Sequence, residues 1–237
     1  MEKNEVRPAS STADINQNYY VREQLEYVNN PGTRRGWKRR YDFACQHVRK
    51  GDTVLDCGCG LGQGTHLLWE RCGNAVGVDI DTRFIEYCTQ HCRDCRFLCL
   101  DVAHGLPFED SSFDVVVAIE LLEHMPSNHA VKRTLSHINR VLKPGGFFIA
   151  SAPNRTSRGG KALYRRLKQS ILKIAGRYIK KQARWHEQFF LWTPESFRSV
   201  LQPYFETVSV FGQWSEGITQ DAANAPYLLA RARKRNA

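Results

Sequence analysis

The segment with the clearest chemistry runs from residue 54 to residue 64, Val-Leu-Asp-Cys-Gly-Cys-Gly-Leu-Gly-Gln-Gly. Its apolar start predicts a short strand that ends in Asp56, and glycines follow at every second position. Glycine tolerates positive φ and lets a ligand lie directly against the backbone. From Thr65 the sequence predicts a helix whose first N–H groups point towards that ligand. The pattern therefore predicts a nucleotide-like cofactor at this turn.

The spacing of the glycines distinguishes between two classes of cofactor. Dinucleotide enzymes use Gly-x-Gly-x-x-Gly, but here Gln63, Thr65 or Leu67 stands where the third glycine should be. The Asp-x-Gly-x-Gly-x-Gly spacing that starts at Asp56 instead resembles motif I of the class I S-adenosylmethionine (SAM)-dependent methyltransferases. SAM has no pyrophosphate and carries an amino-acid tail and a sulfonium, so an acid in the turn is compatible with it. The resemblance implies that SAM is the cofactor.

The resemblance extends from residue 53 to residue 152 and implies which residues bind SAM. In motif I these are Asp56, Gly58 and Gly60. Residues 75–79, Ala-Val-Gly-Val-Asp, predict a second buried strand. Asp79 at its end is the candidate acceptor for both ribose hydroxyls.

A third predicted strand, residues 96–100, ends before Asp101 and Val102. The resemblance assigns the Asp101 carboxylate to the exocyclic amine of adenine and the backbone N–H of Val102 to the ring. Residues 112–118 and 142–151 predict a fourth and a fifth strand, in the order of the family. Acids thus follow three successive strands, which unrelated tight turns and helix caps would not explain.

The residues after the fourth strand are the candidates for catalysis, because open α/β folds bind substrates at the carboxyl ends of their strands. They read Glu-Leu-Leu-Glu-His-Met-Pro from Glu120. Methyl transfer to a hydroxyl requires an acceptor held in line and the removal of its proton. His124, with a reference pKa near neutrality, suits that role; the alternative is a histidine that caps or shapes the pocket. Glu120 is expected to contact the cofactor or to order the loop.

The Glu-x-x-Glu-His spacing of Glu120, Glu123 and His124 also resembles a metal-binding segment. It is similar to that of ubiquinone-biosynthesis O-methyltransferases and of small-RNA 3′-end 2′-O-methyltransferases, where a divalent ion holds the acceptor oxygens and lowers their pKa. In the RNA enzymes a downstream histidine joins the site, and His186 is the candidate here. The resemblance implies Mg²⁺ as a second cofactor. The alternative is that both glutamates are solvated or capping and that the histidines line the pocket.

The acceptor atom is expected to be oxygen. Methyltransferases of exocyclic base amines usually carry an Asn/Asp/Ser-Pro-Pro-aromatic turn after the fourth strand, and this chain has Ala-Ile-Glu-Leu at residues 118–121. Carbon and ordinary amine acceptors stay open.

Eight cysteines without a secretory signal favour free thiols in a reducing compartment. Cys88, Cys92, Cys95 and Cys99 have the spacing Cys-x3-Cys-x2-Cys-x3-Cys, whose first three members coincide with the iron–sulfur triplet of radical SAM enzymes. These cysteines follow the ribose-binding strand, on a predicted helix at 82–91 and on into the third strand. That context favours packing, with Cys88 and Cys99 facing the core.

The net charge of +10 is concentrated in one stretch. Residues 155–184 hold eleven of the 34 Lys and Arg and no acid, which leaves 23 basic against 24 acidic residues elsewhere. Apolar residues there recur at steps of three and four and predict one amphipathic helix. Such a helix can be a lid that steers an acidic substrate, contact an anionic membrane through residues 160–183, or bind RNA phosphates. The lid is favoured, and nucleic acid is not, because no RNA-binding module accompanies the fold.

Length and composition fit one domain, with 237 residues and 42% hydrophobic content. We expect a flexible N-terminus at 1–18 and a single α/β domain at 19–237, with a basic helical insert at 155–185. A basic helix at 34–48 precedes the first strand, and strands at 205–211 and 227–232 complete a doubly wound, seven-stranded, mostly parallel sheet. One of these last two strands is expected to be antiparallel. The chain shows neither a membrane span nor a signal peptide, so a cytoplasmic location is expected.

The leading interpretation is a SAM-dependent methyltransferase that O-methylates a small-molecule or glycan-like acceptor, which can be acidic. One alternative is metal-assisted O-methylation of a quinone precursor or an RNA 3′ end. Another, from a different class, is a non-catalytic SAM-binding protein that docks on a partner through the basic helix.

Overall fold

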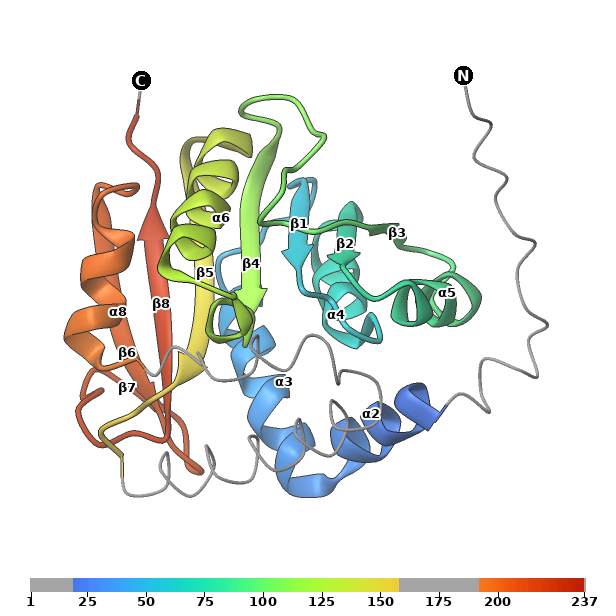
Figure 1. Ribbon diagram of the computed structural model, residues 1–237, viewed down its shortest axis with the longest axis horizontal. Helices are drawn as coiled ribbons and strands as arrows, with labels where there is room; N and C mark the ends of the chain where they lie inside the picture. The colour runs from blue at the N-terminus through green and yellow to red at the C-terminus, as the bar shows by residue number, and fades with distance from the viewer. Residues whose placement is uncertain (1–18, 158–191, 237) are drawn as a thin grey trace.

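The computed structural model describes residues 19–157 and 192–236, which form one eight-stranded sheet with helices on both faces (Figure 1). The strands lie in the order β3-β2-β1-β4-β5-β8-β6-β7. Their bounds are β1 (Val54–Cys57), β2 (Ala75–Asp79), β3 (Arg96–Cys99), β4 (Phe113–Ile119), β5 (Leu142–Pro153), β6 (Thr207–Gln213), β7 (Ile218–Thr219) and β8 (Tyr227–Arg233).

The sheet has the doubly wound order that the sequence predicts. β1 pairs in parallel with β2 and β4, β2 with β3, and β4 with β5. β8 is antiparallel to both of its neighbours, β5 and β6, which confirms one antiparallel strand among the last two predicted ones. The predicted count of seven strands is one short, because the two-residue strand β7 is too short for a residue pattern to reveal it.

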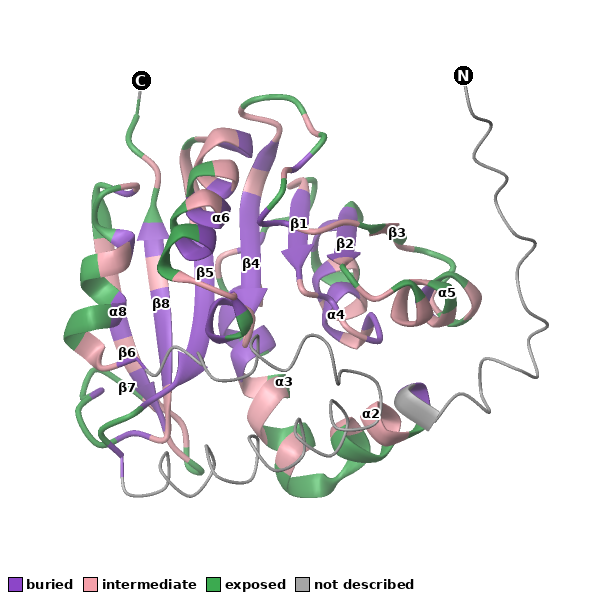
Figure 2. Cartoon of the chain, viewed as in Figure 1, coloured by how far each residue is buried: buried purple, intermediate pink, exposed green. Residues whose placement is uncertain are grey.

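Helices cover the two faces of the sheet, and their bounds are α2 (Tyr19–Asn29), α3 (Pro31–Cys45), α4 (Gln63–Cys72), α5 (Thr82–His91), α6 (Asn128–Val141) and α8 (Pro194–Leu201). β4 shows how one strand serves both faces. Its Val115 and Val117 join a buried cluster with α3 and α4, whereas Val116 and Ala118 join a second cluster with α6 and α8. Alternation along a strand sends successive side chains to opposite faces, and Figure 2 shows the central strands buried on both.

The helix predicted at 34–48 begins earlier and ends earlier than expected, at Pro31 and Cys45. Asn30 caps it by accepting hydrogen bonds from the backbone N–H groups of Gly32 and Thr33, and Pro31 occupies its first turn. Proline is well suited to that position because the first N–H groups of a helix have no partner within the helix. α5 and α8 begin and end as predicted, with Thr193 as the cap of α8.

The chain crosses the sheet between β1 and β4, where the strand order changes direction. Ligands bind at such a switch point, outside the carboxyl ends of the strands. Figure 1 shows the arrowheads of β1 and β4 pointing towards α2 and α3. The fold therefore leaves its binding edge between the strand ends and these two helices. Within the described residues, no helix is long and apolar enough to cross a membrane.

Candidate functional site

Asp56, which is fully buried, supports the turn after β1 from the protein interior. The Thr65 hydroxyl donates to Asp56 Oδ2 at 2.7 Å, and the Tyr41 hydroxyl lies 3.2 Å from both carboxylate oxygens. Burial raises the pKa of Asp56 to about 7, although these two hydrogen bonds oppose the shift. Asp56 therefore faces the inside of the loop, and its carboxylate is engaged with protein hydroxyls.

The glycines of the turn have the conformations that the motif requires. Gly58, Gly60 and Gly62 have φ of 76°, 53° and 76°, in the region that side chains rarely adopt. A Cβ on Gly64 would lie 2.0 Å from the Tyr41 ring, so only glycine lets α4 pack against α3 at this point. A Cβ on Gly60 would meet nothing within 4 Å, which leaves its backbone facing open space.

Gly60 and Asp79, both predicted to bind the cofactor, are in direct contact. The Gly60 N–H donates to Asp79 Oδ2 at 2.9 Å, and the Asp81 N–H donates to the other carboxylate oxygen at 3.0 Å. Burial raises the pKa of Asp79, and these backbone bonds oppose the shift. Each oxygen can accept a further hydrogen bond. Ile80 follows with 66% of its surface exposed, an apolar side chain beside a polar acceptor pair.

Asp101 and Val102 lie next along the same edge. Asp79 lies opposite Cys99, the last residue of β3, and Asp101 follows Cys99 by two residues. Its carboxylate accepts from the Ala103 N–H at 2.9 Å and contacts His104 Nδ1 at 2.5 Å. Val102 is buried, so what it can offer a ligand is its backbone.

Glu120, the first residue after β4, has a left-handed backbone with φ of 54°. Its N–H donates to the backbone oxygen and to Oγ of Ser151, which fixes this conformation. Its carboxylate accepts from Arg40 Nη2 at 2.7 Å. Strained backbone of this kind is found more often at functional sites than elsewhere.

Arg40 is 2% exposed and joins three parts of the chain. Besides Glu120 it donates to Gln213 Oε1 at 3.1 Å, and its guanidinium lies 4.2 Å from the ring centre of Tyr227. Gln213 in turn donates to the Gly36 carbonyl oxygen at 2.9 Å. The helix α3, the end of β4 and the C-terminal strands therefore meet at one buried guanidinium.

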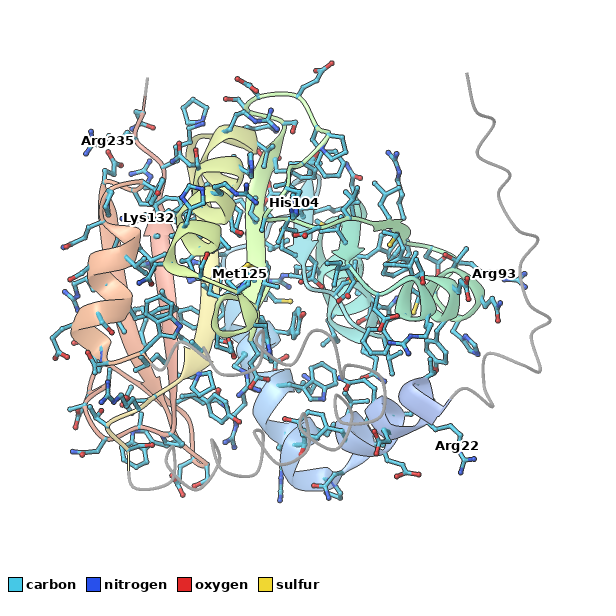
Figure 3. All side chains as sticks on the ribbon, viewed as in Figure 1. Arg22, Arg93, His104, Met125, Lys132 and Arg235 are labelled. Carbon is cyan, nitrogen blue, oxygen red and sulfur yellow. The ribbon has the colours of Figure 1, made fainter. Side chains whose placement is uncertain are left out.

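Glu123 and His124 lie in a short 3-10 helix at 122–124 and differ in exposure. Glu123 is buried, and among the described residues none donates a hydrogen bond to its Oε2. Burial and the nearby Glu120 raise the pKa of Glu123 well above its usual range. His124 is exposed, and Met125 beside it lies near the carboxyl half of β4 in Figure 3.

The predicted metal ligands are brought together only in part. Glu120 is close enough to contribute to the raised pKa of Glu123, but Glu120 is already paired with Arg40. His186 lies outside the described residues, as does nearly all of the basic insert. In the described part of the chain, no group of three or more His, Cys, Asp or Glu is arranged to hold a metal ion.

That finding includes the four cysteines of the predicted helix and third strand. Cys88 is buried, as predicted, but the prediction that Cys99 faces the core is wrong. β3 is the edge strand of the sheet, and Cys99 stands exposed on it with Sγ 3.5 Å from the Ile80 carbonyl oxygen.

Sequence reasoning missed Arg40, Gln213 and the exposed Ile80. Arg40 stands in the basic run Arg-Gly-Trp-Lys-Arg-Arg, where nothing marks one arginine as buried. Ile80 had a usable signal, because it directly follows the strand-end acid Asp79.

Comparison with known proteins agrees with this geometry. Residues 55–150 match the family model described as a methyltransferase domain. A probable SAM-dependent methyltransferase of Mycolicibacterium smegmatis is 36% identical over 126 residues, which are 50% of this chain and 46% of that protein. A demethylmenaquinone methyltransferase of Symbiobacterium thermophilum is 36% identical over 143 residues, 57% of this chain and 54% of that protein. The chain spans about half the length of these curated relatives.

A solved structure supports the fold over a greater length. The SAM-dependent methyltransferase of Thermotoga maritima described as a possible histamine N-methyltransferase superposes with a TM-score of 0.70 at 17% identity, covering 94% of this chain and 99% of that one. The architecture is thus the class I methyltransferase fold. Over residues 55–150 the chain is similar to methyltransferase domains in sequence as well.

Proposed function

We propose that this protein is a SAM-dependent methyltransferase. The observation that carries the proposal is the hydrogen bond between the Gly60 N–H and the Asp79 carboxylate. The Gly60 backbone faces open space, and the exposed Ile80 side chain follows Asp79 in the sequence. A ribose, which offers two hydroxyl donors, and an adenine, which offers an apolar face, fit these groups. The match of residues 55–150 to the methyltransferase-domain model supports the same cofactor.

In this proposal the residues have separate roles. Gly58 and Gly60 present backbone to the amino-acid part of SAM, and Asp79 accepts from the ribose. Asp101 and the backbone of Val102 read the adenine. Asp56 shapes the turn from within, because its carboxylate is buried on Tyr41 and Thr65. Glu120, which Arg40 holds in place, lies beside the methionine part of SAM.

Bound SAM supplies an electrophilic methyl group on a sulfonium, so the chain has to orient an acceptor and remove its proton. We propose O-methylation of a small-molecule or glycan-like acceptor, with the exposed His124 as the base at the mouth of the site. His124 lies five residues after the end of β4 and is accessible to an entering hydroxyl.

One observation favours a second candidate, metal-assisted O-methylation of a quinone precursor or an RNA 3′ end. Glu123 Oε2 is buried and accepts no hydrogen bond from the described residues. Buried polar atoms usually have a partner, and a bound divalent cation would supply one here. A relative from Idiomarina loihiensis, 32% identical over 109 residues, is named a ubiquinone biosynthesis O-methyltransferase. In this second mechanism Glu123 would hold Mg²⁺ together with Glu120, which would have to exchange Arg40 for the ion. His124 and His186 are further candidates.

The two candidates are separated by assaying methyl transfer from methyl-labelled SAM to a panel of catechols, hydroquinones, sugars and short RNAs, in the presence of EDTA or Mg²⁺. Metal-independent transfer that falls in His124→Gln and persists in Glu123→Gln supports the base mechanism. Mg²⁺-dependent transfer that is lost in Glu123→Gln supports the metal mechanism. If SAM binds but no labelled product forms with any acceptor, a non-catalytic SAM-binding role becomes the better account.

A further inference from the structure

Two thiols lie directly beneath the glycine turn. Cys59 stands between Gly58 and Gly60, and Cys88 lies on α5, 29 positions further along the chain. Cys59 is 6% exposed and Cys88 is fully buried. Neither thiol has a role in the proposed methyl transfer.

Both sulfurs approach the same backbone atom. Cys88 Sγ donates to the Gly60 carbonyl oxygen at 3.2 Å, and Cys59 Sγ lies 3.9 Å from that oxygen. The Cys88 thiol also raises the pKa of Cys59, so the two side chains are close enough to influence each other. A Cβ on Gly62 would lie 2.9 Å from Cys88 Sγ, so Cys88 is packed against the turn itself. The two thiols are therefore neighbours that connect the turn to α5.

We propose that Cys59 and Cys88 are an oxidative modification site, which forms a reversible disulfide that distorts the glycine turn and weakens cofactor binding. The effect on the cofactor rests on the proposed function, but the disulfide itself does not.

The chemistry needs a two-electron oxidant, of which hydrogen peroxide is the simplest. One cysteine sulfur attacks a peroxide oxygen, the O–O bond breaks, and a sulfenic acid and one water result. The second sulfur then attacks the sulfenic sulfur, the S–S bond forms, and the hydroxyl leaves as a second water. The two thiol protons end in these waters, and reduction by a dithiol reverses the process. The sulfurs must approach to about 2.05 Å, and both start beside the same Gly60 carbonyl oxygen.

The consequence for the turn follows from Gly60. Its carbonyl oxygen contacts both thiols, and its N–H donates to Asp79. A disulfide has no S–H donor, so oxidation removes the hydrogen bond from Cys88 and draws Cys59 towards α5. Either change displaces the backbone that the ribose-binding carboxylate depends on. The neighbouring Cys88 thiol and burial raise the pKa of Cys59, so the reaction should be slow and should proceed through transient opening of the turn.

In the test, the reduced 237-residue chain is treated with hydrogen peroxide, the remaining thiols are blocked, and the peptides are mapped by mass spectrometry. We expect the Cys59 and Cys88 peptides to be joined with the loss of two hydrogen atoms, and to separate again with dithiothreitol. Cys59→Ser and Cys88→Ser should each abolish the product, whereas Cys99→Ser, which removes an exposed thiol, should not. Because a buried serine can disturb folding, Cys59→Ala and Cys88→Ala serve as a second pair, with circular dichroism confirming the fold.

The same samples are titrated with SAM. We expect oxidised wild type to bind about tenfold more weakly or worse, as the loss of one or two hydrogen bonds would cause, and reduction to restore binding. The modification site is overturned if both thiols stay reduced while Cys99 reacts, or if Cys88 pairs with Cys92 instead. If the disulfide forms but SAM affinity is unchanged, the proposed effect of the disulfide on cofactor binding is wrong. If reduced protein does not bind SAM, the proposed function fails, and the peptide map alone still decides the disulfide.

Discussion

Arg40 and Glu120 form a partly buried ion pair of 2.7 Å between α3 and the residue that follows β4. The two residues are 80 positions apart in the chain, and Glu120 holds a left-handed backbone conformation at the binding edge. Arg40 is also bonded to Gln213, so the pair connects the N-terminal helices, the end of β4 and the C-terminal strands. Together with the Tyr41–Asp56 hydrogen bonds, it attaches α3 to the binding edge.

Replacing Arg40 should therefore cost both stability and cofactor affinity. Arg40→Met keeps the aliphatic stem but leaves Glu120 without its cation, and we expect a loss of about 3 kcal/mol in the free energy of unfolding, measured in urea. Lys38→Met is the matched control. It breaks the exposed Lys38–Asp42 pair on the same helix and should cost at most about 0.5 kcal/mol. Equal losses in the two variants would show that the Arg40–Glu120 pair contributes no more stability than an exposed pair.

Two glycines of the turn should respond differently to alanine. Gly64→Ala places a methyl group 2.0 Å from the Tyr41 ring, so we expect overpacking to destabilise the protein by about 1–3 kcal/mol. Gly60→Ala meets no atom within 4 Å, so its stability cost should be limited to about 1–2 kcal/mol for the left-handed backbone, while SAM binding is lost because the methyl group fills the ligand's space. Thermal unfolding and SAM titration of both variants check this. Normal SAM affinity in Gly60→Ala would show that the cofactor does not bind against Gly60.

Asp56 should make stability depend on pH. Its pKa is raised to about 7 in the folded protein, against about 3.9 in an unfolded chain. Folding therefore favours the protonated form, and the associated stability is fully present below pH 4 and is lost as pH rises towards 7, above which it no longer changes. When the free energy of unfolding is measured in urea at several pH values, it should fall less steeply between pH 4 and 7 in Asp56→Asn than in wild type. Identical slopes would mean that Asp56 is ionised without cost.

The sequence predicted the binding edge through features that are local. Asp79 ends a strand, Gly58 and Gly60 need positive φ, and each of these facts can be read from a few neighbouring residues. The structure adds contacts that no local pattern contains. Arg40 and Gln213 are separated by 173 positions, and their meeting depends on how β6 and β8 pair.

Burial was the harder quantity to predict. An acid at the end of a strand looks the same whether it faces a ligand or the interior, yet Asp79 lies at the open edge and Asp56 is closed off by Tyr41 and Thr65. The exposed Cys99 shows the same limit, since its environment follows from β3 being the edge strand and not from its neighbours in sequence.

The central claim is that Asp79 and the glycine turn bind SAM, and isothermal titration of SAM into the reduced protein tests it most directly. We expect saturable binding that weakens about 10- to 100-fold in Asp79→Ala, the range expected for lost charge-assisted hydrogen bonds. Asp110→Ala, which removes an exposed carboxylate paired with Arg140, should bind as wild type does. Absence of binding in wild type, or equal binding by Asp79→Ala, would contradict the account.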